Sequence, residues 1–181
     1  MNDPFDLKRH IGTVQDYPIG GITFRDITTL LETPSAFVRA CDEMAKLCAE
    51  FNPTAIASIE SRGFIFAGPL ARELALPLVL ARKPGKLPNL AFSREFDLEY
   101  GSTAIEIQKN TALTGQDSVI IVDDLIATGG TAIACAELLN EHFSVAKQNI
   151  LVLALIDLPA LGGSKLIRES GFQAASLVSY D

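Results

Sequence analysis

Val119-Ile120-Ile121-Val122-Asp123-Asp124-Leu125-Ile126-Ala127-Thr128-Gly129-Gly130-Thr131 is the stretch that decides the fold of this chain. Its four leading β-branched apolar residues predict a buried strand over Ser118–Val122, and two acids follow at the carboxyl end of that strand. A small turn rich in threonine and glycine comes next, directly before an amphipathic pattern that predicts a helix over Gly130–His142. A strand that passes through a glycine turn into a helix is the repeating unit of an α/β protein.

The same alternation continues on both sides of this stretch. Further strands are predicted at Thr54–Ile59, Leu76–Ala81, Glu99–Lys109, Ile150–Ile156 and Ala174–Tyr180. Further helices are predicted from Pro34, with Thr33 as its cap, to about Phe51, and at Phe64–Leu74 and Gly163–Glu169. The pattern predicts an α/β fold whose mostly parallel central sheet is flanked by helices. Ligands bind such sheets at the carboxyl ends of strands, so the loops that follow strands are the candidates for function.

Composition limits the classes of protein to which the chain can belong. Its 181 residues are expected to form a single domain, 1–181, and 15 Lys and Arg against 22 Asp and Glu give a net charge of −7. That sign argues against a general nucleic-acid binder and against binding to an anionic membrane. The longest apolar run, Ile150–Ile156, is far shorter than the roughly 20 residues of a membrane span. The first ten residues do not resemble a signal peptide, so a cytoplasmic location is expected.

The three cysteines are too few for a disulfide framework. Cys41 and Cys48 lie seven residues apart on one face of a predicted helix, and Cys135 lies in another. They are expected to be buried, reduced side chains.

The turn after the central strand suits a phosphate. Its backbone N–H groups and the positive end of the following helix favour an anion, and the hydroxyls of Thr128 and Thr131 can add donors. Asp123 and Asp124 suit groups that donate hydrogen bonds, such as vicinal sugar hydroxyls, or a magnesium ion reached through water. A sugar phosphate is therefore the predicted ligand, and an acidic turn with an ordinary helix cap is the alternative. Neither a Walker P-loop nor a Rossmann fingerprint is present.

This stretch resembles the phosphoribosyl pyrophosphate (PRPP) motif of the type I phosphoribosyltransferase family. The resemblance implies that Asp123 and Asp124 hold the ribose 2′- and 3′-hydroxyls. The residues that would hold the 5′-phosphate are Ala127, Thr128, Gly129, Gly130 and Thr131. It also implies the family's fold, a homodimer, and Mg²⁺ that is held mainly by substrate oxygens and water, with no direct protein ligand.

A segment near the start narrows the resemblance. Gly21-Ile22-Thr23-Phe24-Arg25-Asp26-Ile27 is similar to the purine-site segment of the adenine phosphoribosyltransferases, a branch of that family. The likeness places Phe24 against one face of adenine and Leu125 against the other, with backbone groups of Thr23 and Arg25 reading the edge of the base. Residues 1–32 would form a small hood over the purine. The alternative is that Phe24 is a core residue and that Arg25 forms a surface ion pair.

Two further loops follow predicted strands. Glu60-Ser61-Arg62-Gly63 resembles the family's pyrophosphate loop, in which Ser61 and Arg62 would contact the leaving group. The resemblance also implies a cis peptide bond in this loop, which is expected between Ser61 and Arg62; such strained peptides tend to persist only at functional sites. An Arg after a strand can also be a plain surface charge.

The second loop is long and basic at its start. Arg82–Asp97 shows no periodicity and contains two prolines and a glycine, so it is predicted to be irregular. It resembles the flexible catalytic loop of the adenine enzymes, here 82–100, which would place Arg82 and Lys86 on pyrophosphate. A solvated charged loop is the alternative. Phe96 departs from the pattern, because several relatives have a tyrosine there.

Leu98-Glu99-Tyr100-Gly101 ends that loop and is again similar to the adenine branch. Glu99 matches an acid proposed to accept a proton from the purine imidazole ring, which the weakly nucleophilic adenine must lose. Tyr100 would pack or hydrogen-bond over the site. Glu99 could instead form an ion pair within the closed loop.

The resemblance implies an enzyme of purine salvage that makes AMP and pyrophosphate from adenine and PRPP. Two alternatives remain: the same fold acting on hypoxanthine, guanine or xanthine, and a PRPP-sensing regulator without catalysis. The regulators carry an additional basic nucleic-acid-binding region, for which this acidic chain has little room. Adenine and PRPP are thus the expected partners, with no nucleic acid and no membrane.

Overall fold

The computed structural model describes residues 6–98 and 101–180 of the chain. They fall into two compact units, Met1–Glu43 and Met44–Asp181, and the boundary lies inside helix α2 (Pro34–Phe51). This helix begins at Pro34 and ends at Phe51, as predicted.

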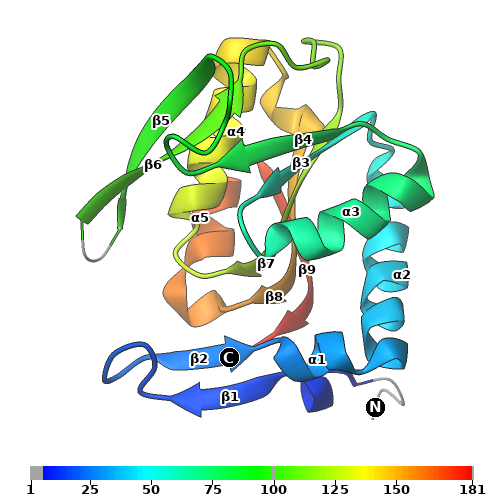
Figure 1. Ribbon diagram of the computed structural model, residues 1–181, viewed down its shortest axis with the longest axis vertical. Helices are drawn as coiled ribbons and strands as arrows, with labels where there is room; N and C mark the ends of the chain where they lie inside the picture. The colour runs from blue at the N-terminus through cyan, green and yellow to red at the C-terminus, as the bar shows by residue number, and fades with distance from the viewer. Residues whose placement is uncertain (1–5, 99–100, 181) are drawn as a thin grey trace. The chain divides into compact units, whose positions relative to one another are not determined.

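The larger unit is built on a seven-stranded sheet with the order β5-β6-β4-β3-β7-β8-β9 (Figure 1). The strands are β3 (Ala55–Ile59), β4 (Leu78–Arg82), β5 (Ala91–Leu98), β6 (Gly101–Gln108), β7 (Val119–Ile126), β8 (Ile150–Asp157) and β9 (Gln173–Ser179). Strands β4, β3, β7, β8 and β9 run parallel to one another, whereas β5 and β6 form an antiparallel hairpin at one edge. The predicted α/β fold with a mostly parallel sheet is confirmed.

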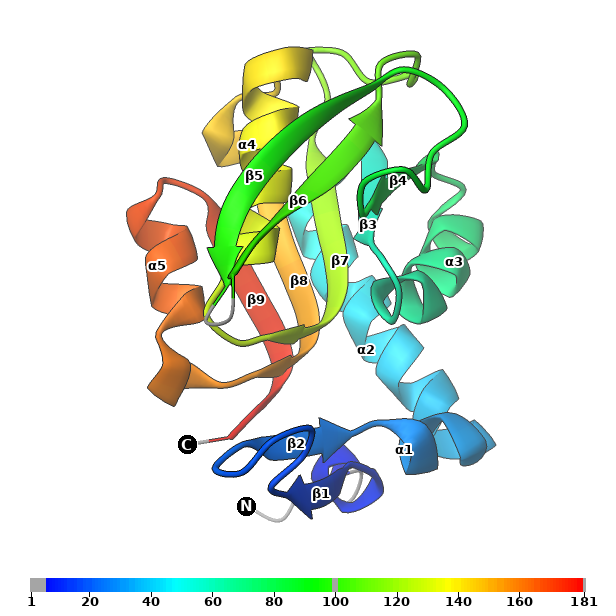
Figure 2. The same cartoon turned by 60° about the vertical axis from the view of Figure 1, so that its left-hand side comes forward.

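Helices cover both faces of this sheet (Figure 2). They are α3 (Gly63–Leu74), α4 (Gly130–Phe143) and α5 (Gly163–Glu169), with short 3-10 helices at Lys147–Asn149 and Pro159–Leu161. Side chains of β7 alternate between the faces, and Ile121 belongs to the core cluster that α4 supplies with Leu138 and Leu139. The opposite face packs against α3. Because β7 lies in the middle of the sheet, its residues Val119–Val122 are fully buried on both faces, which explains the continuous apolar run.

The smaller unit contains a two-stranded antiparallel sheet, β1 (Gly12–Gln15) and β2 (Thr23–Asp26). A 3-10 helix, Leu7–His10, precedes it, and α1 (Thr28–Glu32) follows it before α2 begins. Val14 lies opposite Phe24 in the sheet, and the ring of Tyr17 meets Phe24 edge-on with centroids 5.1 Å apart.

The prediction of an irregular chain over Arg82–Asp97 is wrong in its second half. The irregular segment spans residues 83–90, and β5 then pairs with β6 along its whole length. Phe92 and Phe96 pack against the core from β5, but Arg94 occupies the position between them on the same face and interrupts the apolar alternation.

Strand β7 is also longer than predicted. It continues through both acids to Ile126, because Asp123 pairs with Ala154 and Leu125 with Ile156 of β8. The acids therefore lie within the strand rather than after it.

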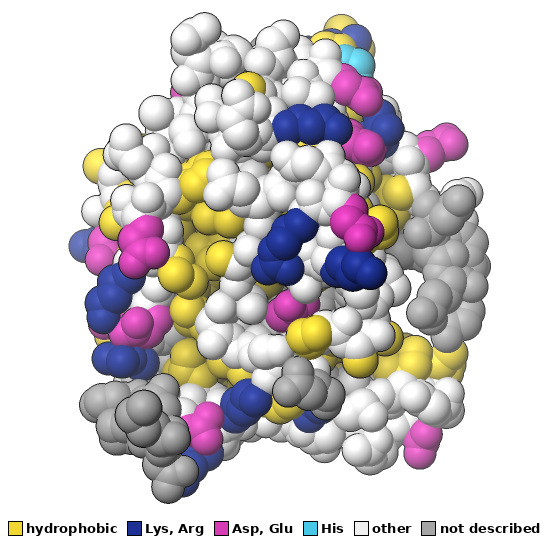
Figure 3. All heavy atoms as spheres, turned by 180° about the vertical axis from the view of Figure 1, so that it is seen from behind, with side chains coloured by type: hydrophobic (Ala, Val, Ile, Leu, Met, Phe, Trp, Pro, Cys, Tyr) yellow, Lys and Arg dark blue, Asp and Glu magenta, His cyan; other side chains and the backbone are white. Residues whose placement is uncertain are grey.

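The cysteines and the surface complete the description of the fold. Cys41, Cys48 and Cys135 are buried and form no disulfide, as predicted. Among the described residues, no helix combines the length and the hydrophobicity needed to cross a bilayer. Acidic and basic side chains are interspersed over the face shown in Figure 3.

Candidate active site

A cavity of about 510 Å³ opens in the larger unit where β3 and β7 end. Its lining comes from the last residue of β3 (Ile59) and the turn after it (Glu60, Ser61, Arg62), from β7 and α4 (Asp123, Asp124, Leu125, Thr131), from the β5–β6 hairpin (Phe96, Thr103, Ala104, Ile105) and from Lys83. Parallel strands bring these turns to one edge of the sheet, as expected for a binding site in an α/β protein. A second cavity, of about 470 Å³, lies in the smaller unit between the first 3-10 helix and α2, and none of the predicted site residues lines it.

The two acids of β7 differ in their surroundings. Asp123 Oδ1 accepts a hydrogen bond from the backbone N–H of Asp124 at 2.8 Å. Asp124 is 4% exposed, and its Oδ2 lies 2.8 Å from Arg62 Nε. That approach does not have hydrogen-bond geometry, and within the described part of the chain Asp124 Oδ2 accepts no hydrogen bond. A buried carboxylate oxygen in this state retains the capacity to accept a hydrogen bond from a ligand hydroxyl.

The electrostatics of the pair are unfavourable in the free site. Burial raises the pKa of Asp123 well above its usual value, and the negative charge of Asp124 raises it further. Arg62 opposes this shift but does not cancel it. The pair is thus suited to ligand groups that donate hydrogen bonds or carry positive charge.

The turn that follows β7 leads directly into α4. Gly129 has φ +85°, a conformation that favours glycine, and its carbonyl accepts the backbone N–H of Ile133 at 2.9 Å as the helix begins. The first N–H groups of α4 have no partner within the helix and carry its positive dipole end. Thr131 lines the cavity, and Ala127, Thr128, Gly129 and Gly130 form the turn just before it. This arrangement can bind an anion.

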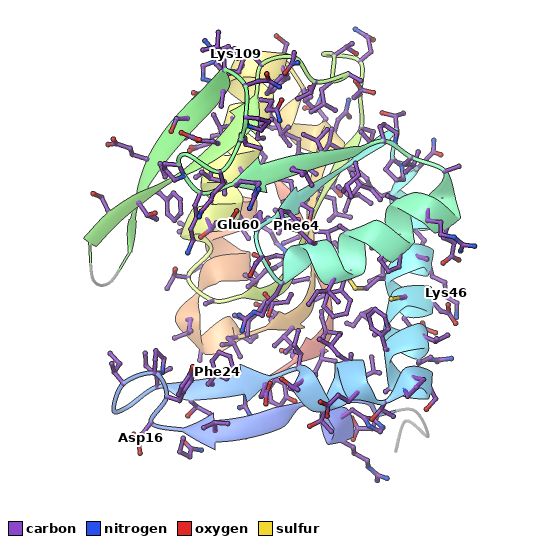
Figure 4. All side chains as sticks on the ribbon, viewed as in Figure 1. Asp16, Phe24, Lys46, Glu60, Phe64 and Lys109 are labelled. Carbon is purple, nitrogen blue, oxygen red and sulfur yellow. The ribbon has the colours of Figure 1, made fainter. Side chains whose placement is uncertain are left out.

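The loop after β3 holds a cis peptide bond between Glu60 and Ser61. The prediction that this bond joins Ser61 and Arg62 is wrong by one residue. The N–H of Glu60 still bonds to the carbonyl of Ala81 on β4 at 3.0 Å, so Glu60 is the last residue held by the sheet and the chain turns at the next peptide. Figure 4 shows Glu60 at this end of β3.

Glu60 also engages the basic loop. Arg82 Nε lies 2.7 Å from Glu60 Oε2, and Arg82 Nη1 donates to the carbonyl of Lys86 at 3.0 Å. The N–H of Gly85 donates to Glu106 on β6 at 3.2 Å. The start of the loop is therefore tied to β3 and β6 through Arg82 and Glu106. Of the three cations in this run, Lys83 is the one that lines the cavity.

The predicted purine segment lies on β2 of the smaller unit. The Thr23 hydroxyl donates to Gln15 at 2.8 Å, and Arg25 Nη1 donates to the hydroxyl of Thr13 at 2.7 Å. Both side chains thus point to β1. Because the sheet has only two strands, half of the backbone groups of β2 point away from β1, as main-chain recognition of a base edge requires. Phe24 lies between Thr23 and Arg25 on the strand and is half-buried (Figure 4).

Known proteins resemble the chain over its whole length. A model of the phosphoribosyl transferase domain matches residues 27–143. An adenine phosphoribosyltransferase of Beijerinckia indica subsp. indica is 45% identical over 100% of this chain and 99% of the relative. The chain belongs to the adenine phosphoribosyltransferase family. Two crystal structures share its fold: the enzyme from Thermoanaerobacter pseudethanolicus (38% identity, TM-score 0.86, covering 96% of this chain and 98% of that one), and the APRTase from Giardia lamblia complexed with 9-deazaadenine (34% identity, TM-score 0.90, covering 97% of each).

The predicted site residues of the chain are only partly gathered in the cavity. Those that line it are Ser61, Arg62, Asp123, Asp124, Leu125 and Thr131. Arg82 and Lys86 belong to the adjoining loop, and the purine segment belongs to the smaller unit. Glu99 and Tyr100 lie outside the described residues.

Three polar or charged lining residues, Glu60, Lys83 and Thr103, were not among the predicted site residues of the chain. Glu60 and Lys83 are charged and each adjoins a predicted site residue in sequence, and these two properties could have indicated that they line the site. Thr103 reaches the cavity only because β6 pairs with β5, opposite Phe96, and no local pattern marks it.

Proposed function

We propose that this chain transfers the phosphoribosyl group of PRPP to adenine, releasing AMP and pyrophosphate, as an enzyme of purine salvage. The observation that carries the proposal is the pair of acids Asp123 (half-buried) and Asp124 (buried), which lines one cavity together with Arg62 and with Thr131 at the start of α4. The full-length identity to adenine phosphoribosyltransferases, and the purine analogue 9-deazaadenine named for the Giardia lamblia structure, support adenine as the acceptor.

PRPP is divided between three groups of residues in this proposal. Asp123 and Asp124 accept hydrogen bonds from the ribose 2′- and 3′-hydroxyls. The 5′-phosphate is bound by backbone N–H groups and hydroxyls of Ala127, Thr128, Gly129, Gly130 and Thr131. Pyrophosphate lies toward Ser61 and Arg62, with Arg82, Lys83 and Lys86 from the loop adding positive charge.

The ion pairs of the free site imply an exchange of partners. Arg62 lies beside Asp124, and Arg82 lies beside Glu60. When pyrophosphate binds, Arg62 turns toward it and leaves Asp124 to the ribose hydroxyls. The same movement of Arg62 then prepares both the ribose site and the pyrophosphate site. PRPP, which carries both groups, should therefore gain more affinity from this movement than a ligand that carries only one of them.

The family resemblance assigns Phe24 and Leu125 to the recognition of adenine, whose edge would be read by backbone groups of Thr23 and Arg25. Glu99 accepts the proton that leaves the imidazole ring as the new bond to the ribose forms, and Tyr100 packs over the site. The segment 82–100, which contains the irregular residues 83–90 and strand β5, is proposed to cover the reactants and to exclude water, which would otherwise hydrolyse PRPP. Residues 1–32 act as the hood of a single catalytic domain, 1–181.

Magnesium is the proposed cofactor, and the carboxylates of Asp123 and Asp124 fit a magnesium ion that they contact through water. Within the described residues, no group of three or more His, Cys, Asp or Glu side chains could hold a metal ion. The ion would therefore take its ligands from PRPP oxygens and water, with Asp123 and Asp124 reached through water. When bound, it neutralises charge that develops on the departing pyrophosphate.

The enzyme is proposed to act as a homodimer in the cytoplasm. The dimer follows from the family resemblance, and size-exclusion chromatography with light scattering tests it. The three buried cysteines without a disulfide are consistent with a reducing compartment.

A base-by-base assay tests the function. The protein is incubated with PRPP, Mg²⁺ and adenine, hypoxanthine, guanine or xanthine, and nucleotide is quantified by chromatography. We expect AMP from adenine and little product from the oxopurines. The Asp123→Asn, Asp124→Asn double variant is the control for contaminating activity. Absence of AMP with a folded protein would exclude the proposal, and a preference for an oxopurine would assign the chain a different base.

A further inference from the structure

The start of α5 lies directly behind the turn proposed to bind the 5′-phosphate. The N–H of Gly163 donates to the carbonyl of Ala127 at 3.0 Å. A Cβ built on Gly163 would overlap that carbonyl oxygen and would lie 2.7 Å from Gly129 N and 2.8 Å from Thr128 C. Gly163 therefore contacts the turn through backbone alone, and no larger residue fits there.

The contact is just as close from the other side. A Cβ on Gly129 would lie 2.9 Å from the carbonyl oxygen of Gly163 and 3.1 Å from its Cα. The N–H of Leu158 also donates to the carbonyl of Ile126 at 3.0 Å, just before the turn. The segment from Leu158 to Gly163 is thus fixed at two points to the chain that leaves β7. By contrast, a Cβ on Gly68 in α3 would meet nothing within 4 Å.

We propose that Gly163 is a positioning residue for the 5′-phosphate, acting through the turn Ala127–Gly129; this inference rests on the proposed function. A binding site made of backbone N–H groups works only while those groups point at one place, to within about 0.5 Å. A methyl group at Gly163 needs roughly 3.5 Å to the turn's atoms, so the two backbones must separate by roughly 1 Å. That separation moves the phosphate donors while Arg62 and its loop keep their place.

Two probes that bind different parts of the site test this inference. Ribose 5-phosphate reports on the turn, and pyrophosphate reports on the basic residues. Titration calorimetry on Gly163→Ala should show about a tenfold or greater loss of affinity for ribose 5-phosphate and less than a twofold change for pyrophosphate. In turnover, KM for PRPP should rise more than kcat falls.

Two matched variants separate positioning from general destabilisation. Ile167→Val removes a buried methyl group that the same helix places in the core cluster, and should lower the melting temperature but keep the ribose 5-phosphate affinity. Gly68→Ala should change neither affinity. Equal losses for both probes in Gly163→Ala, or the same loss of ribose 5-phosphate affinity in Ile167→Val, would overturn the inference.

A measurement on the unaltered protein keeps the test decisive if Gly163→Ala does not fold. Ribose 5-phosphate should slow hydrogen exchange at the Gly163 amide together with the amides of the turn, since that amide bonds to Ala127. Exchange at Gly163 that does not respond to the ligand would refute the coupling. A chain that binds ribose 5-phosphate as described but makes no AMP would refute the proposed function and support this inference.

Discussion

Asp124→Asn should shift the affinities for the two halves of PRPP in opposite directions. Asp124 is buried, accepts no hydrogen bond at Oδ2 within the described part of the chain, and lies 2.8 Å from Arg62 Nε. The substitution keeps the shape of the side chain and removes its charge. A ribose hydroxyl then loses a charged acceptor, while Arg62 loses the anion that competes with pyrophosphate.

The magnitudes follow from the two contacts. A hydrogen bond to a charged group contributes about 1.5–3 kcal/mol and a neutral one about 1 kcal/mol, so ribose 5-phosphate should bind roughly 2- to 30-fold more weakly. The side chain of Arg62 is 41% exposed, so its pairing with Asp124 is partly screened and is worth on the order of 1 kcal/mol or less. Pyrophosphate should therefore bind up to about fivefold more tightly.

Titration calorimetry with ribose 5-phosphate and with pyrophosphate measures both effects. Asp157→Asn is the matched control, because Asp157 is also a buried acid in a parallel strand of the sheet but does not line the cavity. It should leave both affinities unchanged. Weaker binding of both ligands to Asp124→Asn, or no change in either, would refute the exchange of partners by Arg62.

Two further predictions concern stability and the hairpin. The pKa of Asp123 is raised in the folded chain, so the protonated side chain favours the folded state. This contribution to stability is complete below about pH 4, near the pKa of Asp in an unfolded chain, and is lost as pH rises through the folded pKa. Asp123→Asn should therefore unfold at higher urea than the parent at pH 7 and at similar urea at pH 4; a smaller midpoint at pH 7 would contradict this. Arg94 pairs with Glu137 and Glu141 of α4 and holds the β5 strand that brings Phe96 to the cavity, so Arg94→Ala should lower kcat about three- to tenfold but melt within a few degrees of the parent. Restoration of kcat by the charge-reversed pair Arg94→Glu, Glu137→Arg would support a role of this ion pair in positioning β5. An unchanged kcat in Arg94→Ala would exclude that role.

Local sequence patterns predicted a helix or strand correctly where the element depends only on its own residues. The buried run Val119–Val122 can only be an inner strand, and Thr33-Pro34 starts a helix by fixed backbone preferences. Local patterns failed where contacts with another element determine whether a segment is a strand or how far it extends. β5 was predicted to be irregular because Arg94 interrupts its apolar face, and the structure shows that two glutamates of α4 satisfy that arginine. The extension of β7 through Asp123 and Asp124 likewise depends on hydrogen bonds from β8.

By itself, the sequence determined the fold class, the family resemblance and most of the chemistry at the cavity, because strand periodicity and the motif from Val119 to Thr131 are local properties. Tertiary structure alone decided which charges meet: Arg62 with Asp124, Arg82 with Glu60, and Lys83 at the cavity wall. It also decided that Gly163, more than thirty residues beyond the turn, lies against it. The physical reason is that contacts between distant segments depend on the order and register of the strands, which no local pattern encodes.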